Sequence, residues 1–102
     1  MGWNVVKQDE RYKVTDNDTL KKLIKSTTEL NPSHSTSGHS HTDQEEVYIF
    51  RSGSGEMEIN EKRFKVKAGD IIFIEEGDFH RVHNTSSKKL EFVCVFDGSR
   101  SH

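Results

Sequence analysis

Three of the six histidines lie close together in one polar stretch, at positions 34, 39 and 41. His39 and His41 are two residues apart, and on an extended chain this spacing sends both imidazoles to the same face. Two imidazoles on one face can bind one metal ion, whereas a helix would separate them. Glu46 opens the next apolar run, so its carboxylate can approach the same point. The segment therefore indicates a metal site.

The histidines also have simpler interpretations. An isolated HxH pair such as His39 and His41 belongs more often to a solvated loop than to a metal site, because surface histidines are common. His34 is expected near the site but at the surface, and His83 and His102 are expected to be exposed. His80 begins a short run whose alternation places His80 and Val82 on one face.

Short apolar runs follow one another from Glu46 onward, separated by turn-forming residues. The runs are rich in Val, Ile, Phe and Tyr, which fit a pleated sheet, and each is too short for an ordinary helix. They span residues 47–50, 57–59, 64–66, 71–74 and 90–96. This rhythm predicts an all-β domain, either a sandwich or a barrel.

The N-terminal third is harder to interpret. Leu20 and Leu23 follow a helical spacing, but residues 24–30 suit an edge strand equally well. We assign a strand to the later half of this region. Residues 5–6 and 12–14 are short enough to form edge strands, which could pair within the chain or with a partner subunit.

The histidine segment is also one of two spaced motifs. From position 33, the sequence follows the pattern G(X)5HXH(X)3-4E(X)6G except at its first residue. The matched residues are His39, His41, Glu46 and Gly53, and Ser33 stands at the opening glycine. Because Ser33 occupies a turn position, this departure concerns the loop and not the metal ligands.

A second motif follows, with the pattern G(X)5PXG(X)2H(X)3N. Its matched residues are Gly69, Gly77, His80 and Asn84, and Glu75 stands at the proline. Both motifs in this order are typical of the cupin family, and the chain resembles a small single-domain cupin over about residues 30–96.

The resemblance implies a single jelly-roll β-barrel with a short N-terminal segment. It implies one cupin domain over residues 1–102, with the barrel core at about residues 24–97. It also implies one divalent transition metal, held by His39, His41, Glu46 and His80. Such a ligand set leaves one or two positions open for water, dioxygen or a substrate. The nitrogen and oxygen donors suit iron, manganese, nickel, cobalt, copper or zinc, and the sequence does not choose among them.

Strand alternation predicts which residues line the barrel. The expected inner residues are Tyr48, Phe50, Met57, Ile59, Phe64, Val66, Val82 and part of residues 92–96. We take Tyr48, Phe50, Met57 and Val82 as candidate substrate-binding residues. Tyr48 is also the candidate proton donor or substrate anchor, although an ordinary core tyrosine is the plainer alternative.

The expected inner set contains no lysine or arginine, and Arg51, Arg63 and Arg81 are predicted to point outward. A buried phosphate dianion needs cations to hold it. An activity like that of the phosphosugar isomerases among cupins is therefore less favoured than a small neutral or weakly polar ligand. A one-residue shift of register would reverse this argument.

Composition narrows the classes of partner. The chain has 15 Lys and Arg against 17 Asp and Glu, so it lacks the basic excess that binds nucleic acid. No stretch approaches the roughly 20 apolar residues of a membrane span, and the start lacks the features of a signal peptide. We expect a soluble cytoplasmic protein without nucleic-acid or membrane partners. Cys94, the single cysteine, is expected to be a buried, inert thiol.

Two strands are apolar on both faces, which predicts a homodimer. Val47 and Ile49 alternate with Tyr48, and Val93 and Val95 likewise occupy the outer face of their strand. Apolar residues on an outer face need cover from a partner copy or from the N-terminal segment of the same chain. We expect the partner copy to provide it.

These features favour a metal-dependent enzyme that acts on a small molecule, either a dioxygenase or an isomerase or lyase. The intact ligand set and the apolar walls support this function. A non-catalytic module that binds a small ligand or a metal is the alternative, since no residue besides the metal ligands is a compelling general base. A phosphosugar-isomerase-like cupin is the third alternative.

Overall fold

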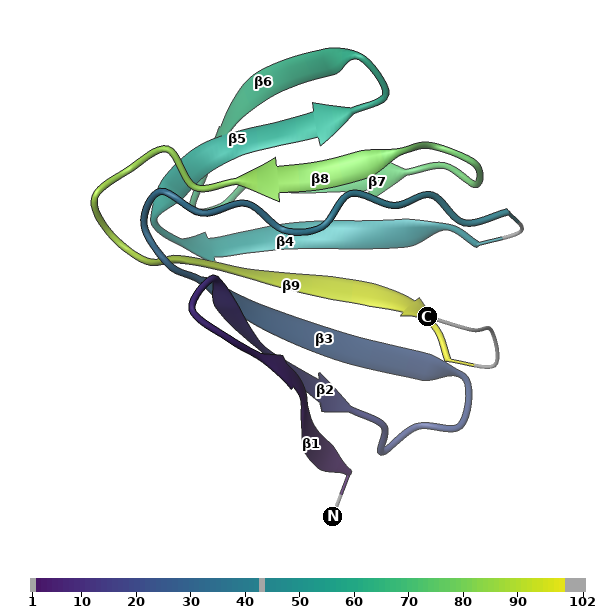
Figure 1. Ribbon diagram of the computed structural model, residues 1–102. Helices are drawn as coiled ribbons and strands as arrows, with labels where there is room; N and C mark the ends of the chain where they lie inside the picture. The colour runs from purple at the N-terminus through teal and green to yellow at the C-terminus, as the bar shows by residue number, and fades with distance from the viewer. Residues whose placement is uncertain (1, 43, 99–102) are drawn as a thin grey trace.

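Nine β-strands form two sheets in the part of the chain that the computed structural model describes, which is residues 2–42 and 44–98 (Figure 1). The strands are β1 (Trp3–Gln8), β2 (Tyr12–Asn17), β3 (Leu23–Leu30), β4 (Glu46–Ser52), β5 (Ser54–Ile59), β6 (Lys62–Lys67), β7 (Ile71–Ile74), β8 (His80–His83) and β9 (Leu90–Asp97). No helix among these residues is long and apolar enough to cross a membrane.

The larger sheet has the order β1-β2-β3-β9-β4-β7, and the smaller one has the order β6-β5-β8. Every neighbouring pair is antiparallel. In Figure 1 the smaller sheet lies above β4, β9 and β3 of the larger sheet, and the segment between β3 and β4 runs alongside β8. This arrangement confirms the predicted all-β jelly roll.

The N-terminal third consists of strands. The strand assigned to its later half is confirmed, because β3 pairs with β9 along its whole length. β1 is the edge strand of the larger sheet, and it pairs with β2 of the same chain. The expectation that residues 12–14 form an edge strand is wrong, since β2 lies between β1 and β3. The tight β1–β2 hairpin covers the edge that β2 would otherwise present.

The core lies between the sheets. Its largest fully buried side chains include Phe50, Leu30, Met57 and Leu90. Burial confirms the inward positions of Tyr48, Phe50, Met57, Val66 and Val82. Phe64 was expected inside as well, but it is 38% exposed. It lies on β6, an edge strand of the smaller sheet of which Val66 alone is buried.

The outer faces of β4 and β9 are better covered within one chain than their sequences suggest. Val93 is only 4% exposed, and Val47, Ile49 and Val95 are half-buried. The most exposed large apolar side chain is instead Phe73 on β7, at 72%. The homodimer therefore stays a prediction, and the four valine and isoleucine residues no longer require it.

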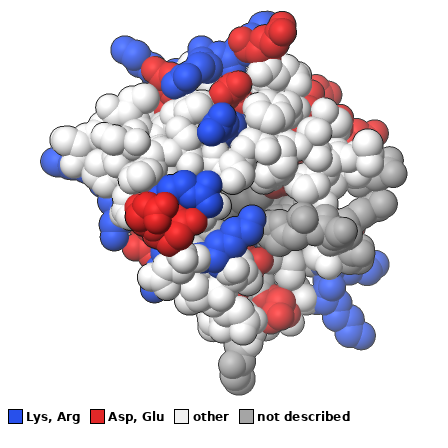
Figure 2. Space-filling view, in the orientation of Figure 1, with Lys and Arg blue, Asp and Glu red and all other residues white. Residues whose placement is uncertain are grey.

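Charged side chains do not gather into a patch of one sign on the face shown in Figure 2. Acidic and basic residues lie beside one another there, with uncharged surface between them. Arg51 and Arg63 are exposed as predicted, and each lies within 4.0 Å of a glutamate. Arg81 is half-buried, and its Nε donates a hydrogen bond to the carbonyl of Thr36.

The two motif ends that are not metal ligands have structural roles. Gly53 adopts a φ of 86°, and a Cβ there would lie 2.5 Å from the carbonyl oxygen of Lys89, so only glycine fits. Asn84 is buried, and its amide donates to the carbonyls of Leu30 and Lys88 at 3.0 and 2.7 Å. These bonds fasten the turn between β8 and β9 to the end of β3.

Ser33 occupies a backbone position that suits glycine. Its φ is 64°, in the left-handed region, and its amide donates to the carbonyl of Asn84 at 3.0 Å. A side chain in this region raises the free energy of the folded state by about 1–2 kcal/mol, and glycine loses about 0.5–1 kcal/mol more entropy on folding. The loop therefore keeps the backbone conformation for which the motif has glycine, although serine occupies the position.

We expect Ser33→Gly to raise the free energy of unfolding by about 0.5–1 kcal/mol, because it relieves the left-handed strain. Urea unfolding measures this change. Ser87→Gly is the matched control, because Ser87 is exposed and has no positive φ, and it should lower stability. Equal destabilisation by both changes would contradict the prediction.

Candidate metal centre

Three of the four predicted metal ligands meet between the two sheets. One ligand atom each from His39, Glu46 and His80 lies within 4.8 Å of the others. His39 comes from the segment between β3 and β4, Glu46 is the first residue of β4, and His80 is the first residue of β8. The site therefore joins the larger sheet to the smaller one.

His39 and His80 are held together by their backbones. The amide of each donates to the carbonyl of the other, at 3.2 Å for His39 and 2.9 Å for His80. This isolated bridge places their ring centroids 4.4 Å apart. Because the bridge extends the chain at His39, it also directs His41 toward the same region. The ring centroids of His39 and His41 are 4.7 Å apart.

His41 lies slightly outside this group of three. Its Nε2 is 3.9 Å from Oε2 of Glu46, whereas Nε2 of His80 is 3.3 Å from the same oxygen. The His41 side chain is also more exposed than that of His80, at 18% against 2%. The structure thus brings all four residues together, with His41 on the outer side.

Two buried atoms at the centre lack a hydrogen-bond partner among the described residues. They are Oε2 of Glu46 and Nε2 of His80. An unsatisfied buried polar atom costs about 1–3 kcal/mol, so such atoms point to a missing partner. A carboxylate and two or three imidazoles are a donor set that suits a divalent transition metal, and the residues present therefore fit one.

The pKa values of Glu46 and His80, which are in contact, shift in opposite directions. Burial raises the pKa of Glu46, but the His80 side chain, in ion-pair contact at 3.3 Å, and the hydrogen bond from Cys94 outweigh it and leave the pKa below its usual value. Burial lowers the pKa of His80, but the Glu46 carboxylate outweighs it and leaves the pKa raised. Glu46 is therefore ionised at neutral pH, as a metal ligand must be.

His39 is kept neutral. Burial lowers its pKa to about 4, and the positive charges that His80, His41 and Lys7 carry when protonated act in the same direction. A neutral imidazole has a lone pair free for a metal, so His39 needs no deprotonation before it binds one at pH 7.

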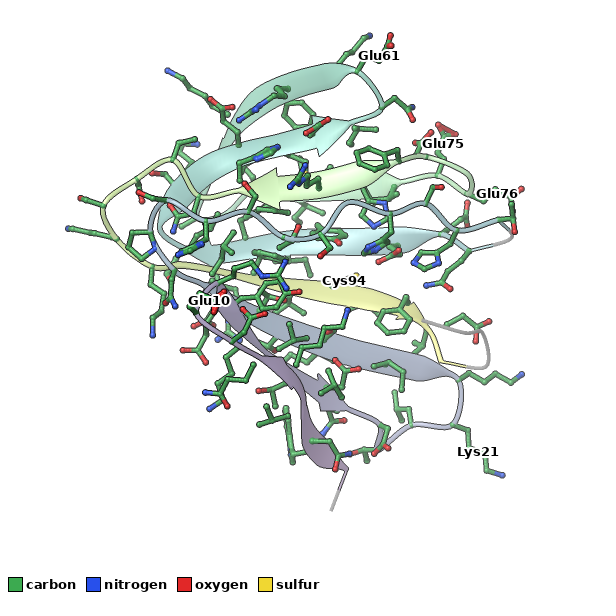
Figure 3. All side chains as sticks on the ribbon, in the orientation of Figure 1. Glu10, Lys21, Glu61, Glu75, Glu76 and Cys94 are labelled. Carbon is green, nitrogen blue, oxygen red and sulfur yellow. The ribbon has the colours of Figure 1, made fainter. Side chains whose placement is uncertain are left out.

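Cys94 has a role that the sequence did not reveal. Its Sγ donates a hydrogen bond to Oε1 of Glu46 at 2.8 Å, which leaves Oε2 directed at the histidines. Figure 3 shows Cys94 on β9. Alternation placed Cys94 on the inner face, but the pairing of β9 with β4 could not be inferred from the sequence. The thiol orients the candidate ligand without binding the metal itself.

Cys94 should react very slowly with thiol reagents in the native protein. Burial, and then the nearby Glu46 carboxylate, raise the pKa of the thiol, so the reactive thiolate is scarce. At pH 8 we expect modification at least about 100-fold slower than in urea-unfolded protein, where the thiol is exposed. A native rate close to the unfolded rate would contradict this burial.

A cavity of about 270 Å³ adjoins the centre. His39, Glu46, Tyr48 and Cys94 all contribute to its wall. Three of the candidate substrate-binding residues, Phe50, Met57 and Val82, do not contribute, because they are buried in the core beside it. Burial raises the pKa of Tyr48 well above its usual value, so its hydroxyl stays protonated.

The expectation of a cavity without lysine or arginine is wrong. Lys7 lies in the wall together with its neighbour Val6. Both belong to β1, whose place as the edge strand of the larger sheet, beside the cavity, could not be deduced from its sequence. The alternating pattern of β1 is the one signal available, and a bulge breaks it between Val5 and Lys7.

The other histidines fall outside the centre. His83 was expected to be exposed, but it is only 9% exposed. The segment between β3 and β4 pairs with β8 at Ser35, and Ser35 and Glu58 lie 2.6 and 2.7 Å from the two ring nitrogens of His83. His34 does not line the cavity, and His102 lies outside the described residues.

Glu75 and Glu76 lie at the tip of the turn between β7 and β8, as Figure 3 shows. Both side chains are exposed. Neither belongs to the wall of the 270 Å³ cavity. They are therefore surface carboxylates of a turn, outside the wall of this cavity.

Comparison with known proteins supports this interpretation. A model of the cupin domain family matches residues 26–96. The oxalate-binding protein of Thermotoga maritima is 36% identical over 66 residues, which are 65% of this chain and 54% of that protein. An uncharacterised protein of Methanocaldococcus jannaschii is 33% identical over 64 residues, which are 63% and 51% of the two chains. The chain thus spans about half the length of the curated relatives it matches.

Solved structures resemble the whole fold. A predicted oxalate decarboxylase from Thermotoga maritima has a TM-score of 0.74 and 29% identity, over 83% of this chain and 80% of that one. The oxalate decarboxylase of Bacillus subtilis, in a study of its Mn(II) centres, has a TM-score of 0.84 and 19% identity, over 97% and 29%. This second likeness concerns the fold alone. Since the family model covers most of the chain and the fold agrees, the chain belongs to the cupin family.

Proposed function

We propose that this cupin holds one divalent transition metal through His39, His41, Glu46 and His80, and that it is a metal-dependent enzyme acting on a small oxygen-donor ligand in the adjoining cavity. The observation that carries the proposal is the pair of buried, unpartnered atoms on Glu46 and His80. Both residues meet His39, and two of these three residues line a cavity large enough for a small molecule.

The names of two relatives support an oxygen-donor ligand. One is an oxalate-binding protein and the other a predicted oxalate decarboxylase. When bound, a divalent metal acts as a Lewis acid that polarises a coordinated oxygen. Lyase chemistry of the decarboxylase type fits this setting best, and a dioxygenase is the neighbouring possibility within the same proposal.

The protein's own residues would orient the ligand and exclude water. Tyr48, Phe92 and Phe96 provide aromatic wall beside the metal centre. The rings of Tyr48 and Phe92 stack with centroids 5.5 Å apart, which fixes the position of the Tyr48 hydroxyl. Because its raised pKa keeps that hydroxyl protonated, Tyr48 can donate a hydrogen bond to the ligand and cannot serve as a base near pH 7.

A non-catalytic binding module is the second candidate. Among the described residues of the cavity wall, the carboxylates and imidazoles are confined to the proposed metal ligands Glu46 and His39. Tyr48 and Cys94 both have raised pKa values, so neither offers a base. A site of this kind can bind an acid tightly without turning it over.

Metal analysis followed by turnover assays tests the proposal. Protein purified without affinity metals or chelator should contain near-stoichiometric metal, and His39→Ala protein prepared in parallel should not. Oxalate added to the loaded protein should then release carbon dioxide or consume dioxygen. Calorimetric binding without turnover would establish the second candidate instead, and wild-type protein that holds no divalent metal would overturn both.

A further inference from the structure

We propose that Lys7 is a second anchor in the cavity, which pairs with an anionic group of the ligand and makes the site selective for small dianionic acids. The inference rests on the proposed function, because the metal centre is the first anchor. It adds a residue from the N-terminal hairpin, which lies outside the region that the cupin family model matches.

The backbone of β1 places Lys7 at the cavity by a local irregularity. In a regular strand, Val6 and Lys7 would point to opposite faces. Both nevertheless line the cavity. Val5 pairs with Thr15 and Lys7 pairs with Val14, so Val6 is an extra residue opposite no partner of its own. Such a β-bulge redirects side chains, and bulges are frequent beside active sites.

Two positive charges beside the cavity, one at the metal centre and one on Lys7, would neutralise a dianionic ligand. A divalent metal bound by the single carboxylate of Glu46 and by neutral imidazoles carries one excess positive charge. Lys7 adds a second charge, and no lysine or arginine besides Lys7 contributes to the described wall. No salt bridge to Lys7 is present among residues 2–42 and 44–98. Its ammonium is therefore available to an incoming carboxylate.

The remaining wall suits a small acid in both size and polarity. Ser26, Thr28, Thr36 and Ser37 line it, and a serine or threonine hydroxyl can donate a hydrogen bond to a carboxylate oxygen. The volume of about 270 Å³ lies just below the usual range for ligand pockets, so the ligand has few carbon atoms. Charge-assisted hydrogen bonds to such a ligand are stronger than neutral ones.

Ligand selectivity of Lys7 variants tests the inference. Manganese-loaded protein would be titrated by calorimetry with oxalate, malonate and succinate as dianions and with acetate as the monoanion. In Lys7→Met, we expect the preferred dianion to bind about 10- to 100-fold more weakly, in line with a lost hydrogen bond to a charged group. Acetate binding should change little, and Lys7→Arg should restore most of the preference for the dianion.

Lys13→Met is the matched control. Lys13 lies on β2 of the same hairpin, opposite Gln8, and does not line the cavity. The Lys13→Met protein should therefore bind each of the four acids with the affinity of the wild type. Unchanged selectivity in metal-loaded Lys7→Met, or no preference for a dianion in the loaded wild type, would overturn this inference alone. Wild-type protein that takes up no manganese would overturn the proposed function together with it.

Discussion

His80→Ala protein should lose its metal, with an affinity more than about 100-fold below that of the wild type. Losing an outer partner of a metal ligand typically costs 10- to 100-fold, and losing the ligand itself costs more. His80 is the most buried of the three candidate histidines, and its Nε2 has no other partner among the described residues. Elemental analysis after dialysis against metal-free buffer measures the result.

A second histidine of the same segment provides the control. His34 lies five residues before His39 and takes no part in the cavity wall. His34→Ala protein should therefore retain full metal content after the same dialysis. Equal metal in the His80→Ala and wild-type proteins would show that the buried centre is not the binding site.

Removal of the metal should lower the melting temperature by more than about 10 °C. A ligand at 1,000 times its dissociation constant stabilises the native state by about 4 kcal/mol, and 1 kcal/mol shifts the midpoint of a domain this size by about 4–8 °C. The ligands come from both sheets, so the metal links β4 to β8 and relieves the two unpartnered atoms. Calorimetric scans with and without chelator measure the shift.

The His39→Ala variant separates this effect from a general action of the chelator. It lacks a ligand, so its midpoint should be the same with and without chelator. A wild-type protein that melts at the same temperature in both conditions would contradict a bound, stabilising metal.

Spacing along single strands carried much of the predicted site. His39 and His41 share a face whenever the chain is extended, and their backbone bridge to β8 keeps it extended. Tyr48 and Met57 could likewise be placed by alternation, because each strand has one buried face. These features depend on residues near one another in the chain, so they can be predicted from the sequence alone.

Features that depend on pairing between distant segments could not be predicted. Cys94 orients Glu46 only because β9 pairs with β4 in one particular register. His83 is buried because an irregular segment covers it, and Phe64 is exposed because β6 ends its sheet. Lys7 needed both the position of β1 and its bulge. A one-residue change in any of these strand registers would move the side chain to the other face of its sheet. The amino-acid composition does not determine the register.

The placement of the β1–β2 hairpin has an evolutionary consequence. The candidate ligands lie within residues 26–96, where the family model matches, whereas Lys7 lies on a hairpin before that region. All six residues of β1 are exposed, so substitutions there leave the buried core and the metal ligands untouched. Under the role proposed for Lys7, natural variation in this one hairpin would alter the ligand preference while the candidate metal ligands stay unchanged.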